Sequence, residues 1–300
     1  MSTPATYVPL RNSRSRFIAI GDLRCHVREW GPPEAPLLVL LHGARDTSAS
    51  FQFVVDALSR SWRVVAPDWR GHGLSSWTAG HYWLSDFLGD LDAVLRDCAP
   101  GEAAPIAAHS MGGAIASVYA GIRPDRISHL VLLDSLGPSL NRLPVHVAPT
   151  LSDLLTSLAA ERARRPYADI ADMTDRLMRG NRRLSRARAG FIAEVNAQPL
   201  PGGGFGWPYD PGFTRIWPTL HSVAEWGECW RRIAAPVLCL TASDARVNGS
   251  TSDPEAVRER GRFFRNLTLR SVPETGHNLH HDAPAAVAEA LEDFIRLPLG

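Results

Sequence analysis

Residues 105–122 read PIAAHSMGGAIASVYAGI, and this stretch decides the fold. Its first part, Pro105–Ala108, is a short apolar run typical of a buried strand. Its second part, Met111–Ile122, is a longer apolar segment typical of a helix that packs on a sheet. Ser110 stands at the junction. The sequence therefore predicts a strand, a tight turn and a helix, with the serine hydroxyl lifted clear of the sheet.

Strands and helices alternate on both sides of this stretch. Short apolar runs predict strands at 16–20, 24–30, 37–41, 63–66, 129–133, 236–240 and 267–272. Apolar residues at helical spacing predict helices at 47–60, 82–98 and 284–295. The first two strands flank Gly21-Asp22 and are expected to form a hairpin. The alternation favours an α/β fold with a mostly parallel sheet that helices cover on both faces.

This alternation stops between residues 136 and 232. The segment is rich in arginine, with helical patterns at 151–164, 170–179 and 185–195 before a glycine-rich stretch. Because the strand pattern returns at 236, we expect an insertion into one domain. The prediction is a core formed by 1–135 and 233–300 that carries a helical cap, or lid, at 136–232.

The bulk composition excludes several function classes. The chain has 32 basic and 31 acidic residues, so nothing indicates a nucleic acid or an acidic membrane as partner. All the basic residues are arginines, which excludes a Schiff-base lysine and a Ser-Lys dyad. The four cysteines form no CxxC pair, and no secretory signal or membrane-spanning run is visible. A cytoplasmic location is expected, and the oligomeric state stays open.

The turn around Ser110 carries a family resemblance. Residues 108–112, AHSMG, resemble the G-x-S-x-G nucleophile elbow of the α/β-hydrolase family, with Ala108 in place of the first glycine. Residues 271–277, SVPETGH, follow the last expected strand and resemble the family's final histidine motif. The resemblance implies an α/β-hydrolase fold in which Ser110 is the nucleophile and His277 is the base.

The same resemblance implies an acid that orients His277. Asp244, which follows the strand at 236–240, matches the family's usual position and is the expected acid. Some relatives place the acid one strand earlier. Asp134 follows the strand at 129–133 and is the alternative here.

The oxyanion hole is expected from two backbone N–H groups. One belongs to Met111, the residue after the nucleophile. The other is expected at Ala44, because residues 41–44, LHGA, resemble the family's H-G-x loop. By the same resemblance, His42 is expected to brace this loop, and residues 68–75, DWRGHGLS, to be scaffold.

The function expected from these residues is hydrolysis of a carboxylic ester or lactone on a small molecule, through an acyl-enzyme and without a cofactor. Alternatives that use the same residues are C–C bond or amide hydrolysis and a non-catalytic ligand receptor. No metal site is expected, and His280 and His281 are interpreted as surface or hydrogen-bonded loop histidines. The cap segments 173–185 and 210–232 resemble a serine hydrolase-like branch of the family, which leaves the substrate open. A cap arginine that receives a substrate carboxylate is a further alternative to a solvated lid.

Overall fold

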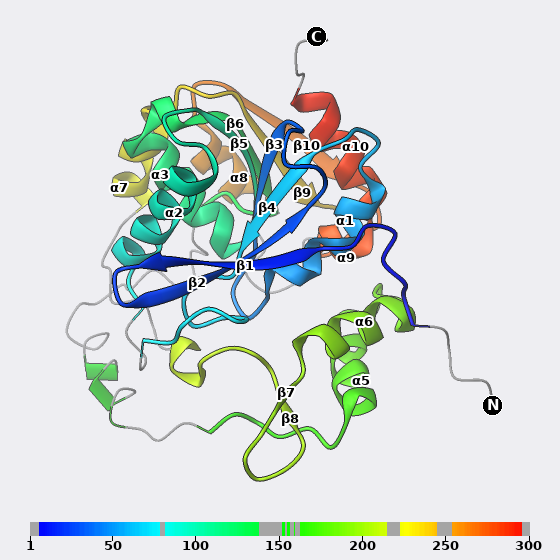
Figure 1. Cartoon of the computed structure of the whole chain (residues 1–300). Helices are drawn as coiled ribbons and strands as arrows, with labels where there is room; N and C mark the ends of the chain where they lie inside the picture. Colours follow the sequence, from blue (N-terminus) through cyan, green and yellow to red (C-terminus); the bar gives the residue numbers. More distant parts are fainter. Residues whose placement is uncertain are drawn as a thin grey trace.

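The computed structural model describes residues 6–78, 82–137, 163–214, 223–244 and 254–295, with 152, 153, 155, 156 and 159. Within these residues, eight strands form one sheet in the order β1-β2-β4-β3-β5-β6-β9-β10 (Figure 1). The strands are β1 (Arg14–Ile20), β2 (Leu23–Trp30), β3 (Leu37–Leu41), β4 (Arg63–Pro67), β5 (Ala104–His109), β6 (Ile127–Leu133), β9 (Val237–Ala242) and β10 (Leu267–Val272).

The sheet is parallel except at one edge, as predicted. β2 pairs antiparallel with both β1 and β4, and the remaining neighbours pair parallel. The predicted hairpin is confirmed, and Gly21 takes a positive φ of 58° at its turn. Parallel pairing places the carboxyl ends of β3, β5, β6, β9 and β10 along one edge of the sheet, where ligands bind in open α/β sheets.

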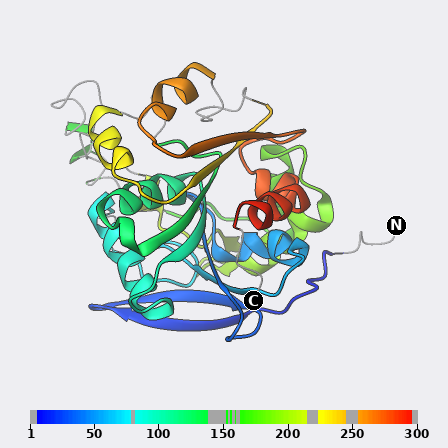
Figure 2. The same cartoon turned by 90° about the horizontal axis from the view of Figure 1, so that it is seen from above.

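Helices cover both faces of the sheet, also as predicted (Figure 2). One face is covered by α1 (Gln52–Ala57), α9 (Leu279–Asp282) and α10 (Pro284–Phe294). The other is covered by α2 (Leu84–Cys98), α3 (Met111–Ile122), α7 (Val223–Arg231) and α8 (Pro254–Gly261). Apolar side chains from both sides of each strand are therefore buried, which explains the continuous apolar runs in the sequence.

The helix expected at 47–60 is shorter in the structure. A 3₁₀ turn, Ser48–Phe51, leads into α1, which ends at Ala57. Beyond it, the backbone N–H groups of Ser59 and Arg60 donate to the carboxylate of Glu292 on α10, at 3.0 and 2.8 Å. The helix ends early because this tertiary carboxylate accepts those two hydrogen bonds.

The inserted segment contains two helices close to their predicted positions, α5 (Ile170–Gly180) and α6 (Arg186–Asn196). Side-chain oxygens of Asp169 and Ser185 accept hydrogen bonds from the first turns of these helices, as N-caps do. A two-stranded ribbon follows, formed by β7 (Gln198–Pro199) and β8 (Phe205–Gly206), and then a 3₁₀ turn, Pro211–Thr214. The helix predicted at 151–164 lies largely outside the described residues.

Helix α7 falls inside the predicted cap but packs on the core. Its Trp230 Nε1–H donates to Ser117 Oγ of α3 at 3.0 Å, and the indole is fully buried. At Gly121 of α3, a Cβ would lie 2.1 Å from the carbonyl oxygen of Cys229. The boundary expected at residue 232 therefore falls too late in the chain, because α7 is a core helix by its packing. The rest of the division into core and cap stays a proposal.

Gly121→Ala tests this packing. We expect it to lower the free energy of unfolding by about 1–3 kcal/mol, because α3 and α7 must separate to admit the methyl group. Gly89→Ala is the matched control, since a Cβ on that α2 glycine meets no atom within 4 Å. The control should stabilise the protein by roughly 0.5–1 kcal/mol. Urea unfolding measures both, and equal stabilisation by the two changes would contradict the assignment of α7 to the core.

Candidate active site

Ser110 occupies a strained turn between β5 and α3. Its backbone has φ 48° and ψ −116°, an unusual conformation for a residue other than glycine. A Cβ at Gly112 would lie 2.6 Å from the carbonyl oxygen of His42, so only glycine permits this close approach. At Gly113, a Cβ would lie 2.5 Å from Ser135 Oγ. The two glycines predicted to start the helix are therefore required by contacts of the turn.

Three side chains meet at the carboxyl ends of the strands. Ser110 Oγ lies 2.9 Å from His277 Nε2, and His277 Nδ1 lies 2.6 Å from Asp134 Oδ2. The Asp134 side chain is fully buried, whereas that of His277 is 31% exposed. The imidazole can thus meet a substrate on one side while a buried carboxylate fixes it on the other.

The expectation that Asp244 would contact His277 is wrong. Both ring nitrogens of His277 already face Ser110 and Asp134. Asp244 Oδ2 instead accepts a hydrogen bond from Arg183 in the cap, at 2.8 Å. The carboxylate that reaches His277 thus follows β6, which lies between β5 and β9 in the sheet, and is the alternative that the sequence offered. A positive φ of 46° at Asp134 turns the chain at this point.

The loop after β3 lies against the nucleophile. A Cβ at Gly43 would lie 3.1 Å from Ser110 Cβ, which brings the neighbouring Ala44 to the same edge of the sheet. His42 braces this loop as expected: its Nδ1–H donates to the Gly43 carbonyl at 2.7 Å, and its Nε2 accepts from the Trp69 N–H at 3.0 Å. Met111 begins α3, where the first N–H groups of a helix have no intrahelical partner.

Comparison with known proteins identifies the fold family. A family model described as the alpha/beta hydrolase fold matches residues 36–284. The chain belongs to the α/β-hydrolase family. It is 27% identical to the serine hydrolase-like protein of Danio rerio, over 97% of this chain and 91% of that protein. It is 26% identical to the esterase Rv0045c of Mycobacterium tuberculosis, over 89% of this chain and 84% of that one.

A solved structure agrees with this assignment. The thioesterase domain from the curacin biosynthetic pathway superposes with a TM-score of 0.84 at 26% identity, over 93% of this chain and 99% of that domain. Among the described residues of this α/β hydrolase, no helix is long and apolar enough to span a membrane.

The loop at 68–75 is a scaffold in this α/β hydrolase, and it also holds the inserted segment. Asp68 is buried and accepts hydrogen bonds from the Ser48 N–H and from His26 Nδ1, both at 2.7 Å. The Gly73 N–H donates to the Pro208 carbonyl of the inserted segment at 2.6 Å. The loop therefore contacts both the core and the inserted segment.

Further contacts of the inserted segment reach the loop that carries His277, and no pattern in the sequence predicts them. Asn181 Nδ2 donates to Asp282 Oδ1 at 2.6 Å, and Asp282 Oδ2 accepts the Gly276 N–H at 2.8 Å. Arg188 donates to the His281 carbonyl at 3.0 Å. The inserted segment thereby contacts the chain on both sides of His277.

The histidines next to the triad are buried, which corrects the surface interpretation of His280 and His281. Their exposed fractions are 0% and 7%. His109, which precedes Ser110, is also buried, and its ring centroid lies 4.4 Å from that of His280. Burial lowers the pKa of His109 well below its usual range, because the imidazolium would lose hydration there.

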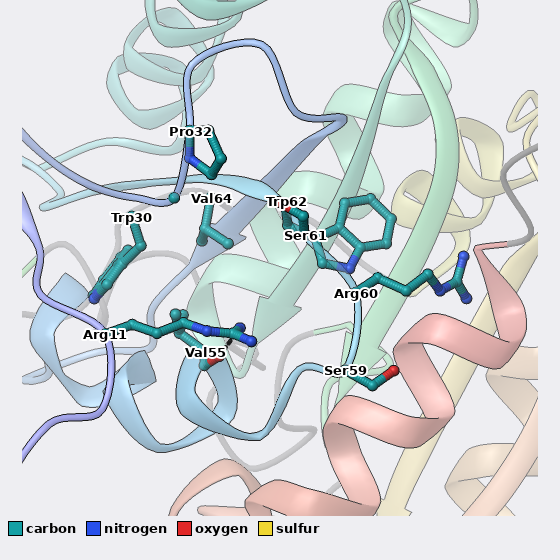
Figure 3. A pocket seen from close by; sticks show the side chains of 10 residues that line it. Arg11, Trp30, Pro32, Val55, Ser59, Arg60, Ser61, Trp62 and Val64 are labelled. Carbon is teal, nitrogen blue, oxygen red and sulfur yellow. Dashed lines mark hydrogen bonds between the residues drawn. The ribbon is translucent and has the colours of Figure 1, made fainter. Parts of the chain in front are cut away.

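A separate hollow lies at the opposite end of the sheet (Figure 3). Gly31 and Trp62, which line it, precede β3 and β4, so it faces the amino ends of these strands. Its Ser59 hydroxyl is engaged with Glu292, and its Arg11 guanidinium donates to backbone carbonyls of the core. The hollow therefore has the character of a structural crevice, and the triad marks the candidate active site.

Buried neutral histidines predict an acid-sensitive fold. Burial lowers the pKa of both His72 and His281 to about 3. In the unfolded chain these groups titrate near pH 6.5, so between these values the unfolded state binds more protons. Stability is therefore full above about pH 6.5 and falls as the pH decreases, by up to about 1.4 kcal/mol per pH unit for each histidine.

Urea unfolding between pH 7 and pH 5 checks this dependence in a range where most carboxylates stay ionised. His72 Nε2 accepts the Arg45 N–H at 3.1 Å, so protonation at this nitrogen removes a hydrogen bond of the oxyanion loop. We expect His72→Gln to reduce the slope of stability against pH. His129→Gln, at a less buried imidazole, should reduce it less. A slope that is unchanged in His72→Gln would contradict the prediction.

Proposed function

We propose that this α/β hydrolase is a cofactor-independent serine hydrolase that cleaves a carboxylic ester or lactone of a small molecule through an acyl-enzyme on Ser110. The observation that carries the proposal is the continuous relay from Ser110 Oγ to His277 to Asp134, with contacts of 2.9 and 2.6 Å. This arrangement supplies a nucleophile, a base and an orienting acid, each in contact with the next.

In the proposed mechanism, Ser110 Oγ attacks the substrate carbonyl carbon and its proton passes to His277 Nε2. Asp134 accepts the Nδ1–H hydrogen bond, which keeps the other nitrogen free as a base and stabilises the imidazolium. The imidazolium then protonates the leaving alcohol as the acyl-enzyme forms. A water molecule gives a proton to His277 as it attacks the acyl-enzyme, and His277 passes that proton to Ser110 Oγ as the bond between Oγ and the acyl carbon breaks and the carboxylic acid leaves.

The oxyanion of each tetrahedral intermediate is assigned to the N–H groups of Ala44 and Met111. Two observations support this assignment: the loop after β3 lies against Ser110, and Met111 is the first residue of α3. The start of a helix also places positive partial charge toward the oxyanion. His42 and His72 hold the loop from both sides through its backbone, which preorganises the first of these donors.

The relatives support acyl transfer as the reaction class. By their names, they include an esterase and a thioesterase domain, and both reactions proceed by attack on an acyl carbon. C–C bond or amide hydrolysis and a non-catalytic receptor are the alternatives that use the same site. The cytoplasmic location stays a prediction of the sequence.

A panel of p-nitrophenyl esters with short to long acyl chains, a lactone and an acyl thioester tests the reaction. We expect the wild type to turn over at least one of these, and Ser110→Ala to lose on the order of 10³-fold or more in kcat. The variant should keep the wild-type unfolding transition, since it removes only a hydroxyl. Retained turnover in a clean Ser110→Ala preparation would refute the mechanism.

A fluorophosphonate probe separates the alternatives. Labelling of Ser110 without turnover of any ester, lactone or thioester would direct the search to C–C and amide substrates. A failure of all of these substrates would then favour the receptor.

A second prediction distinguishes the two carboxylates. Asp134→Asn should lower kcat by about 10⁴-fold, as removal of the orienting acid does in serine proteases. Asp244→Asn should change kcat by only a few-fold, because it removes a partly exposed ion pair with Arg183, a contact worth about 0–1 kcal/mol. Both changes are isosteric, so each is the other's control. A larger loss in Asp244→Asn would restore Asp244 as the acid.

A further inference from the structure

We propose that Asp46, His109 and His280 form a binding site for one transition-metal ion of the Zn²⁺ class, beside the triad and separate from it. One ligand atom from each residue lies within 4.8 Å of the other two. The three come from the loop after β3, from the end of β5 and from α9. Ser110, His277 and Asp134 supply none of these atoms.

The hydrogen bond of His109 leaves one of its nitrogens available for a metal. Its Nε2 lies 2.8 Å from the carbonyl oxygen of His277. Because a carbonyl only accepts, Nε2 carries the hydrogen and Nδ1 keeps a lone pair. Nδ1 is buried and has no hydrogen-bond partner in the described part of the chain. Metal-binding histidines typically donate their other N–H to a carbonyl or carboxylate in this way.

The loop after β3 lies directly beside this nitrogen. A Cβ at Gly43 would lie 2.7 Å from His109 Nδ1, so a larger residue at position 43 would press on the imidazole.

The imidazole of His280 is the second buried group that makes no hydrogen bond within the described residues. It is fully buried, and neither of its nitrogens makes a hydrogen bond to any other described residue. Its Nε2 lies 3.5 Å from Asp46 Oδ2. Leaving such polar atoms unpaired is costly, so the site favours a ligand that binds nitrogen lone pairs.

Asp46 is held in place by hydrogen bonds, and it is the most exposed of the three residues of the site. Its Oδ1 accepts the Thr47 N–H, and its Oδ2 accepts the Ser50 hydroxyl, both at 2.8 Å. Hydrogen bonds of this kind orient metal-binding carboxylates. The Asp46 side chain is 15% exposed, whereas the two imidazoles are buried. An ion therefore enters past the carboxylate.

The donor set selects the class of ion. Two imidazole nitrogens and one carboxylate oxygen suit Zn²⁺ and the neighbouring divalent ions Co²⁺, Ni²⁺ and Cu²⁺, whereas Mg²⁺ and Ca²⁺ prefer all-oxygen sites. Tetrahedral bonds of about 2.1 Å place ligand atoms about 3.4 Å apart. The 3.5 Å between Asp46 Oδ2 and His280 Nε2 fits this edge, and the ligand atom of His109 lies within 4.8 Å of the other two. A fourth position remains for water.

Calorimetric titration of the chelator-stripped, untagged full chain with ZnCl₂ tests the site. We expect about one ion per chain in the wild type. Asp46→Asn, which preserves shape, and His280→Gln should each weaken binding by about 10–100-fold or more. Cobalt(II) should give the visible absorption of a four-coordinate site without a thiolate charge-transfer band. Zn²⁺ should also raise the Tm of the wild type more than that of Asp46→Asn.

Two controls exclude other ligands. Cys229 has a half-buried thiol and His277 a partly exposed imidazole, so Cys229→Ser and His277→Gln should keep the wild-type stoichiometry. The proposal is overturned if the wild type binds no ion, if Asp46→Asn keeps wild-type affinity, or if cobalt shows a thiolate band that Cys229→Ser abolishes. Binding does not need Ser110, so this result stands apart from that of the esterase assay.

Discussion

The hydrogen bond between His277 Nδ1 and Asp134 Oδ2 sets the geometry on which the rest of the site depends. Its 2.6 Å length and the full burial of the carboxylate fix the orientation of an imidazole that is otherwise partly exposed. Only in that orientation does Nε2 face the hydroxyl of Ser110. The carboxylate is itself held in place, because Asp134 Oδ1 accepts a hydrogen bond from the Ala242 N–H of β9. The backbone N–H of Asp134 also donates to the Leu240 carbonyl.

Parallel strands make this convergence possible. Ser110, Asp134 and His277 follow three different strands, and all three strands end at the same edge of the sheet. The strained backbone at Ser110 and at Asp134 is tolerated because packing on both faces of the sheet restrains the strand ends. The three positions are thus set by a rigid framework while the loops between strands remain able to vary.

The inserted segment reaches the site through contacts with the core loops, some to backbone and some to side chains. It donates to Asp282 and to the His281 carbonyl on one side, and it accepts from the Gly73 N–H on the other. Asp244 belongs to this set of contacts through its ion pair with Arg183. The residue that the family resemblance first suggested as the acid therefore contacts the cap.

The sheet and the helices on both of its faces could be predicted from the sequence, because they depend on local periodicity that is visible in a single chain. The pairing of Ser110 with His277 was predicted from the resemblance of two short motifs to the α/β-hydrolase family. The sequence left both Asp134 and Asp244 open, because each follows a strand that ends near Ser110. Only the folded chain shows that Asp134 contacts His277, whereas Asp244 pairs with Arg183. The same holds for α7, whose amphipathic pattern does not reveal which surface it covers. Asp46, His109 and His280 are far apart in the chain and have no metal-ligand spacing, so only the fold brings their buried donor atoms together.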